Sequence, residues 1–213
     1  MRKYYPVNLV LENKICVVVG GGAVAQRKVQ RLLECAALVS VISPAITPGL
    51  KRLAAKNKIL FKNKEVELKD LNGAYLVIAA TSDRKINSFV SSYCLKKGIL
   101  INVVDFPQEC NFILPSIVKR GNLTISISTD GISPALAKKI RRDLEKEFGA
   151  EYADLLRILK EARPLAIKKI KNARARKAFF QKVLSTEILS LLKKKNEKQA
   201  KQIIAEYLKN AEL

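Results

Sequence analysis

The sequence predicts an α/β protein with a parallel sheet in its first half, followed by a region of different character. In the first half, short runs rich in β-branched residues alternate with segments whose apolar residues recur at helical spacing. From residue 150 onward there is no glycine, one proline interrupts the chain, and the pattern is helical. These observations predict a doubly wound sheet with a helical appendage.

The elements of the first half follow one another in a regular rhythm. Residues 23–35 and 85–97 carry helical patterns, and the second of these helices should end at Gly98. Residues 43–56 form a turn that becomes helical. The runs that predict buried parallel strands are 15–19, 38–42, 75–81 and 99–105.

The pattern changes after about residue 112. Two extended runs flank the turn signal "KRGN", and "LTISIS" alternates apolar with polar residues, so a β-hairpin with one buried face is expected. A helix should follow, with Ser133 as its N-cap and Pro134 at its first position, and should end at Gly149. The remaining chain predicts three or four further helices.

Composition limits the classes of function. The chain has 213 residues and a formal charge of +21, which favours a polyanionic partner: nucleic acid, an anionic membrane surface or a small substrate with many carboxylates. A lysine-rich solvated surface is the plainer alternative. No stretch approaches the roughly 20 apolar residues of a membrane span, and the N-terminus does not resemble a signal peptide, so we expect a cytoplasmic protein. The four cysteines should be free thiols, mostly buried.

The stretch "CVVVGGGAVAQRK" has the spacing of a dinucleotide-binding loop, directly after a strand and opening a helix. Gly20 would allow the tight turn, Gly22 the close approach of a pyrophosphate, and Ala25 close packing of the helix on the sheet. The N–H groups at the helix start, from Gly22 through Ala23 and Val24, would bind the pyrophosphate.

The end of the second strand lacks the acidic residue that often binds the adenosine ribose. The chain reads Ser43, Pro44 and Ala45 there, so a serine hydroxyl and backbone groups could hold the ribose instead. No arginine is present at this position to bind a 2′-phosphate, which favours NAD over NADP.

Asp105 lies at the carboxyl end of the last strand predicted in the first half. It could simply cap a turn before Pro107. The chain has no histidine, however, so a carboxylate at the ligand-binding edge of the sheet is the obvious proton acceptor. No permanent metal site is visible.

Four segments in order resemble the precorrin-2 dehydrogenase family, which includes the dehydrogenase part of siroheme synthase and dehydrogenase/ferrochelatases. They are "GGGAVAQRK" (20–28), "NVVD" (102–105), "NFILPSIVKRGNLTISIST" (111–129) and "GISPALAKKIRRDLE" (131–145). The resemblance covers roughly residues 1–150.

The resemblance implies three parts and a homodimer. The parts are a Rossmann-type NAD-binding domain at 1–112, a dimerisation segment with a β-hairpin and helix at 113–149, and a C-terminal helical domain at 150–213. Two chains would intertwine through the central segment.

The resemblance also implies a reaction, in which precorrin-2 loses a hydride to NAD⁺ and a proton to give sirohydrochlorin. Precorrin-2 carries many carboxylates, which suits a basic protein. The family's important aspartate falls on Asp105, as general base or proton-positioning group. Its NAD-contacting loops fall on Gly22–Val24 and Ser43–Ala45, with Thr81 a further candidate. Some members also insert Fe²⁺ into the product, so this lyase activity is open here.

Two other classes compete with the enzyme. A nucleotide-sensing regulatory module could share the glycine loop and a dimer, but it would not need "NVVD". A nucleic-acid-binding protein would suit the charge, but the sequence has no zinc finger or aromatic RNA-binding motif.

Overall fold

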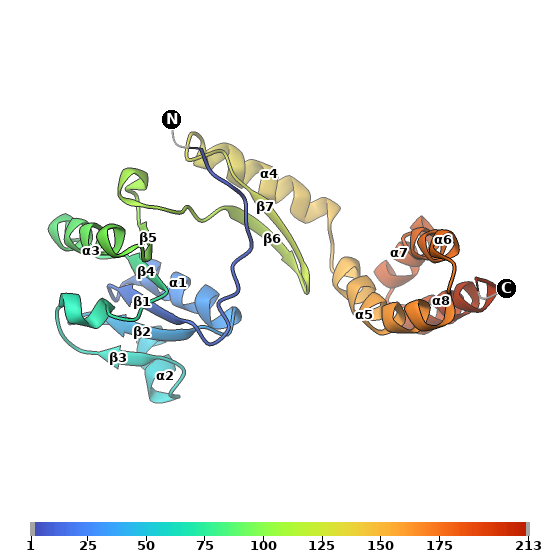
Figure 1. Ribbon diagram of the computed structural model, residues 1–213, viewed down its shortest axis with the longest axis horizontal. Coiled ribbons are helices and arrows are strands. Elements are labelled where there is room, and N and C mark those ends of the chain that lie inside the picture. The colour runs from blue at the N-terminus through green and yellow to red at the C-terminus, as the bar shows by residue number, and fades with distance from the viewer. Residues whose placement is uncertain (1–2, 212–213) are drawn as a thin grey trace. The chain divides into compact units, whose positions relative to one another are not determined.

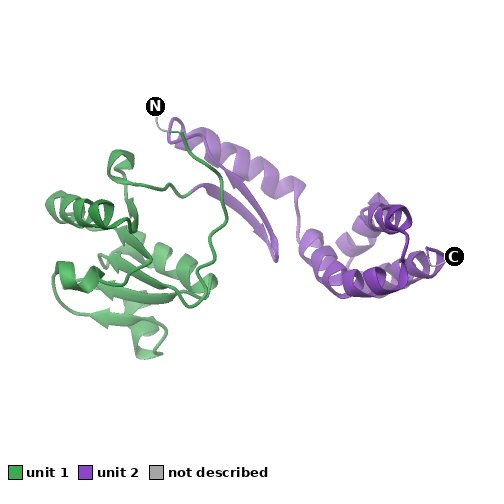
Figure 2. Cartoon of the chain, in the orientation of Figure 1, with its two compact units in different colours: residues 1–114 green, residues 115–213 purple. Residues whose placement is uncertain are grey.

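The computed structural model describes residues 3–211, and the chain divides into two compact units, residues 1–114 and 115–213 (Figure 2). The first unit therefore ends two residues beyond the predicted boundary at residue 112. The second unit contains both the segment 113–149, apart from its first two residues, and the helices after it. The division between these two parts stays a prediction.

The first unit is a five-stranded parallel sheet in the order β3-β2-β1-β4-β5 (Figure 1). This is the doubly wound arrangement that the sequence predicts. Its strands are β1 (Ile15–Val19), β2 (Leu38–Ile42), β3 (Leu60–Lys62), β4 (Leu76–Ala79) and β5 (Leu100–Val103). Its helices are α1 (Ala23–Glu34), α2 (Pro48–Ala55), α3 (Arg84–Lys97) and the short 3₁₀ turns η1 (Leu68–Leu71) and η2 (Pro107–Glu109).

Alternate residues of the central strands face two separate apolar clusters. Val18 lies on one face, packed with α1 and α2, whereas Val17 lies on the other, packed with α3 and η1. Both sheet faces are thus covered, which explains why the strands read as continuous apolar runs.

Some predicted boundaries differ from the structure. The strand predicted at 99–105 ends at Val103, because the backbone turns at Val104 and Asp105, and Asp105 has φ +64°. Within the predicted turn and helix at 43–56, the helix begins at Pro48, with Thr47 as its N-cap. Sequence reasoning missed β3, because its apolar run, residues 59–61, is only three residues long and is flanked by lysines.

The second unit begins with the predicted hairpin of β6 (Ser116–Arg120) and β7 (Leu123–Ile127). Helix α4 (Pro134–Glu147) packs on this hairpin, and the Ser133 hydroxyl accepts a hydrogen bond from the backbone of Leu136, as an N-cap does. The Arg120 guanidinium donates to the carbonyls of Glu145 and Phe148 at the other end of the helix. The hydrogen bond to Leu136 confirms the prediction that Ser133 is the N-cap of this helix.

Four further helices share one apolar cluster that includes Ile158, Phe179 and Ile188. They are α5 (Glu151–Lys169), α6 (Ala173–Val183), α7 (Thr186–Lys193) and α8 (Glu197–Asn210). Within residues 3–211, no helix combines the length and apolar character needed to cross a membrane.

The cysteines are free, and Cys16, Cys94 and Cys110 are buried. Cys35 is exposed, because it lies at the C-terminal cap of α1, beyond the face that packs on the sheet. Burial raises the pKa of the Cys16 and Cys94 thiols to about 11.

Candidate functional site

The glycine loop between β1 and α1 is packed against the neighbouring strands. The Gly20 N–H donates to the carbonyl of Ile42 at 2.9 Å, and Gly20 has φ +118°. A Cβ at this position would lie 2.5 Å from the carbonyl oxygen of Ala80. The position therefore requires glycine for both backbone conformation and space.

Gly21 is equally constrained, although the sequence pattern assigned it no role. A Cβ there would clash with the carbonyl oxygen of Ala45, and the Gly21 carbonyl accepts a hydrogen bond from the Thr47 N–H at 3.0 Å. These contacts hold the glycine loop against the segment after β2. The run of three consecutive glycines in the sequence was the feature that could have indicated this constraint at Gly21.

Gly22 is the N-cap of α1 and faces open space. No side chain caps this helix, and a Cβ on Gly22 would meet nothing within 4 Å. The N–H groups of the first turn, which includes Ala23 and Val24, therefore have no side-chain cap, and the helix dipole favours an anion at this end of the helix. An uncapped helix start beside tightly packed glycines fits the pyrophosphate of a dinucleotide.

The segment Ser43–Ala45 lies at the carboxyl end of β2, beside this loop. Ser43 is buried, and its hydroxyl donates to the carbonyl of Ala45 at 2.7 Å, while Pro44 and Ala45 are exposed. The serine proton is therefore used to shape the turn. Its oxygen lone pairs remain suited to accept a hydrogen bond from a ribose hydroxyl.

Thr81 follows β4, and its hydroxyl lies 2.9 Å from the carbonyl of Asp83 and 2.8 Å from the side-chain oxygen of Asn87. Asn87 is buried and also donates to the Thr81 carbonyl at 3.0 Å. Thr81 thus stabilises the turn between β4 and α3. Asn87, which the sequence pattern did not single out, fixes that turn from inside α3.

Asp105 lies two residues beyond the end of β5, is exposed, and adopts a left-handed backbone conformation. Aspartate tolerates this conformation better than most residues, but it is still strained. The Val104 N–H donates to the carbonyl of Ala79 at 3.0 Å, which ties the turn to β4. The strained turn holds Asp105 at the carboxyl edge of the sheet.

Lys28, on the second turn of α1, interacts electrostatically with Asp105. Partial burial is the main cause that lowers the pKa of Lys28, and the neighbouring Arg27 lowers it further, while Asp105 opposes both. Val104 and Val29, next in sequence to these two residues, belong to the same packed cluster. Sequence reasoning missed Lys28, since only the fold brings α1 beside this turn.

The loop after Asp105 is anchored to α3. The Arg84 guanidinium lies 3.9 Å from the centre of the Phe106 ring, and the Ser91 hydroxyl donates to the Glu109 carbonyl at 2.6 Å. These contacts hold the chain after Asp105, and the Val104 hydrogen bond to Ala79 holds the chain before it, so Asp105 lies on an anchored loop.

The predicted residues thus gather along one edge. Gly20, Ser43, Thr81 and Asp105 come after β1, β2, β4 and β5, and parallel strands end on the same side of their sheet. The edge combines an anion-binding helix start with a carboxylate.

Comparison with known proteins identifies the family. A model described as "Putative NAD(P)-binding" matches residues 7–116, about half of the chain. A model for a sirohaem biosynthesis protein central region matches residues 120–147, and one for a sirohaem synthase dimerisation region matches residues 151–208. The chain belongs to the precorrin-2 dehydrogenase family, the dehydrogenase part of siroheme synthase. The prediction of a nicotinamide dinucleotide cofactor is confirmed.

Relatives and a solved structure agree with membership of this family. The chain is 35% identical to siroheme synthase of Thioalkalivibrio sulfidiphilus over 205 residues, covering 96% of this chain and 42% of that protein. It is 37% identical to siroheme synthase of Nitrosococcus oceani, covering 93% and 42%. The chain therefore spans less than half the length of these curated relatives.

The solved structure named "SirC, precorrin-2 dehydrogenase" matches with a TM-score of 0.81 and 28% identity, covering 96% of this chain and 100% of that one. The similarity of this precorrin-2 dehydrogenase family member to SirC thus extends along the full length of SirC, through both compact units.

Proposed function

We propose that the chain catalyses the NAD-dependent dehydrogenation of precorrin-2 to sirohydrochlorin, a step in siroheme biosynthesis. The observation that carries the proposal is the match to SirC over that protein's whole length. The site adds independent support, because it pairs a dinucleotide cradle with a carboxylate on one sheet edge.

In this proposal the glycine loop binds the dinucleotide. Gly20 sets the turn, Gly22 leaves room for the pyrophosphate, and the N–H groups of Ala23 and Val24 stabilise its charge. Ser43 and its neighbours hold the adenosine ribose. When bound, NAD⁺ supplies the hydride acceptor, and the protein contributes binding and orientation.

Asp105 is proposed as the general base or proton-positioning group. The reaction releases a proton as well as a hydride, and the chain has no histidine to receive it. The Asp105 carboxylate is exposed on an anchored turn, so it can reach a substrate at the sheet edge. The chain's excess of basic residues suits a substrate rich in carboxylates.

The decisive experiment is anaerobic incubation with precorrin-2 and NAD⁺, following sirohydrochlorin and NADH together. Asp105→Asn is the test variant, because asparagine tolerates the left-handed backbone and removes only the charge. Asp130→Asn is the matched control, since Asp130 is exposed and has φ +52°. We expect stoichiometric products from the wild type and the control, and a loss of at least a hundredfold in kcat for Asp105→Asn.

Other outcomes are informative. Full turnover by Asp105→Asn would keep the reaction and refute the role of Asp105. A wild type that binds NADH without turnover would favour a nucleotide-sensing module instead. Iron insertion, tested by adding Fe²⁺ after the first reaction, and a cytoplasmic location both stay predictions.

We also propose that the chain forms a homodimer through the segment 113–149. Leu136 and Ile140 are exposed apolar residues one turn apart on α4, and the exposed Ile132 lies just before the helix, so this segment presents apolar surface to solvent. Leu136→Asp should shift the protein to monomers in sedimentation measurements. Leu184→Asp, at an exposed leucine in the region matched by the dimerisation model, is the comparison. If Leu184→Asp dissociates the dimer and Leu136→Asp does not, the interface lies among the C-terminal helices instead.

A further inference from the structure

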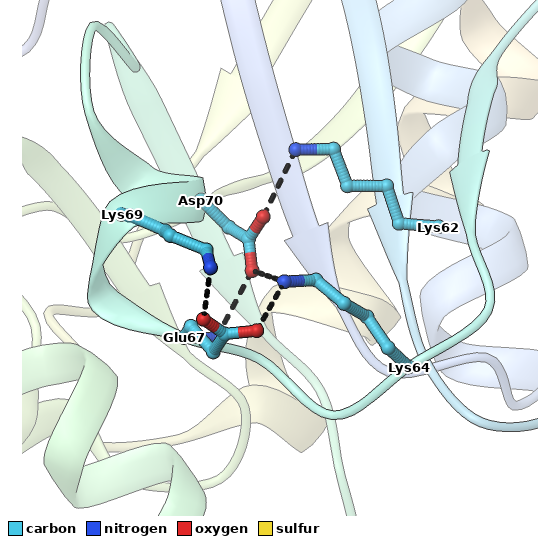
Figure 3. A network of polar contacts seen from close by, with 5 residues as sticks. All are labelled: Lys62, Lys64, Glu67, Lys69 and Asp70. Atoms are coloured by element: carbon cyan, nitrogen blue, oxygen red, sulfur yellow. Dashed lines mark hydrogen bonds and ion pairs between the residues drawn. The ribbon is translucent and has the colours of Figure 1, made fainter.

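A network of lysines and carboxylates begins at Lys62, the last residue of the edge strand β3, and continues into the segment after it (Figure 3). The Asp70 carboxylate is 4% exposed and binds the Lys62 ammonium at 3.0 Å and the Lys64 ammonium at 2.8 Å. It also accepts from the backbone N–H of Glu67 at 3.0 Å. The Glu67 carboxylate in turn binds Lys64 and Lys69, each at 2.6 Å.

The backbone places this network next to the proposed ribose site. Lys62 is the direct partner of Ile42, the last residue of β2, in the parallel pairing of the two strands. The Ser43 N–H donates to the Lys62 carbonyl at 3.2 Å. The network therefore begins one hydrogen bond away from the residue that would contact the adenosine ribose.

Two lysines beside that position would ordinarily attract a phosphate on the ribose. Dinucleotide sites that accept NADP place a cation where the 2′-phosphate lies. Here the side chains of Lys62 and Lys64 are 35% and 33% exposed, but their ammonium groups are turned to Asp70. A phosphate that recruited them would leave a buried carboxylate without its partners, which is costly.

Resting on the proposed function, we propose that this network makes the site selective for NAD over NADP, because Asp70 holds the two ammonium groups that would otherwise bind the 2′-phosphate. Asp70 acts as a specificity-determining residue that does not touch the cofactor. Glu67 has the same effect on Lys64 alone.

The test measures the dissociation constants of NADH and NADPH by their fluorescence. For the wild type we expect tighter binding of NADH. Asp70→Asn should tighten NADPH binding about tenfold and leave NADH within about twofold, and the gain should shrink as salt is raised. Changing both Lys62 and Lys64 to Met in the Asp70→Asn protein should abolish the gain.

Glu67→Gln provides a second variant that does not depend on a buried side chain, because the Glu67 side chain is half exposed. It should tighten NADPH binding by a smaller factor, about threefold. Glu65→Gln is the matched control, since it removes the same charge from an exposed residue in the same segment. It should leave both affinities unchanged.

The outcomes separate this inference from the proposed function. One possible result is that the protein binds NADH, but neither Asp70→Asn nor Glu67→Gln tightens NADPH binding. This result would overturn the network's role and leave the cofactor assignment intact. An equal gain from Glu65→Gln would overturn it too, because general charge would then explain the effect. A wild type that binds neither nucleotide would refute the proposed cofactor and this inference together.

Discussion

The Cys110 thiol lies 3.1 Å from the backbone nitrogen of Val103, the last residue of β5, and closes the loop that carries Asp105. Its sulfur also lies 3.2 Å from the carbonyl of Phe106, the residue after Asp105. The thiol thus contacts the backbone on both sides of the strained turn. A buried, small side chain thus ties together the two ends of the turn that carries Asp105.

Replacing this thiol should therefore affect stability and turnover together. Cys110→Ala leaves the Val103 N–H without the sulfur contact and should lower the free energy of unfolding by about 1–3 kcal/mol. We expect a lower kcat with little change in NADH affinity. Cys110→Ser, whose hydroxyl can make similar hydrogen bonds, should recover part of the loss. Cys35→Ala, at an exposed cysteine, is the control, and a kcat for Cys110→Ala equal to it would refute the positioning role.

Gly20 and Gly22 should respond differently to the same substitution. Gly20→Ala places a Cβ against the Ala80 carbonyl with φ +118°, so we expect destabilisation of about 2 kcal/mol or more. Gly22→Ala meets no protein atom and has an ordinary extended backbone, so stability should change by less than about 0.5 kcal/mol. NADH binding should nevertheless weaken at least tenfold, because the Cβ enters the pyrophosphate space. Thermal unfolding measures the two stabilities, and titration with NADH measures the two affinities. An unchanged NADH affinity in Gly22→Ala would contradict the placement of the pyrophosphate at Gly22.

Replacing Lys28 should lower the turnover rate more than it changes the stability of the fold. Because burial lowers its pKa, the folded protein binds this proton less well than the unfolded chain, and the charged lysine costs stability below its folded pKa. Lys28→Met should therefore be as stable as the wild type at pH 7, or slightly more stable. Its kcat should fall about tenfold, because Asp105 loses a nearby cation. Arg27→Met, at the exposed neighbouring residue, is the comparison, and an equal effect on kcat would rule out a specific role for Lys28.

Asp70 should contribute to the acid stability of the first unit. Burial by itself would raise its pKa, but hydrogen bonds from Lys64, Lys62 and the Glu67 backbone outweigh burial and hold the pKa well below its usual range. The group then stabilises the fold fully above its unfolded pKa of about 4, and this contribution is lost as the pH falls below that value. Asp70→Asn should be less stable than the wild type at pH 7, and the difference should shrink in urea unfolding measured toward pH 2. A difference independent of pH would show that packing, not charge, accounts for it.

Local patterns explain what could be predicted. The strand at Ile15–Val19, the glycine loop after it and the Ser133 cap each depend on residues close together in the chain, where composition and spacing carry the signal. The left-handed Gly98 that ends α3 is of the same kind. The predicted site residues lie on one sheet edge for a similar reason, since each directly follows a parallel strand.

The order of the elements, the glycine loop and the carboxylate near the end of the last strand could therefore be read from the amino-acid sequence. The order of the strands in the sheet, the presence of β3 and the electrostatic interaction of Lys28 with Asp105 emerge only from the folded structure. It also placed the Asp70 network next to Ser43. These relationships join residues that are distant in sequence through packing and backbone pairing, and such contacts leave no periodic pattern in the chain.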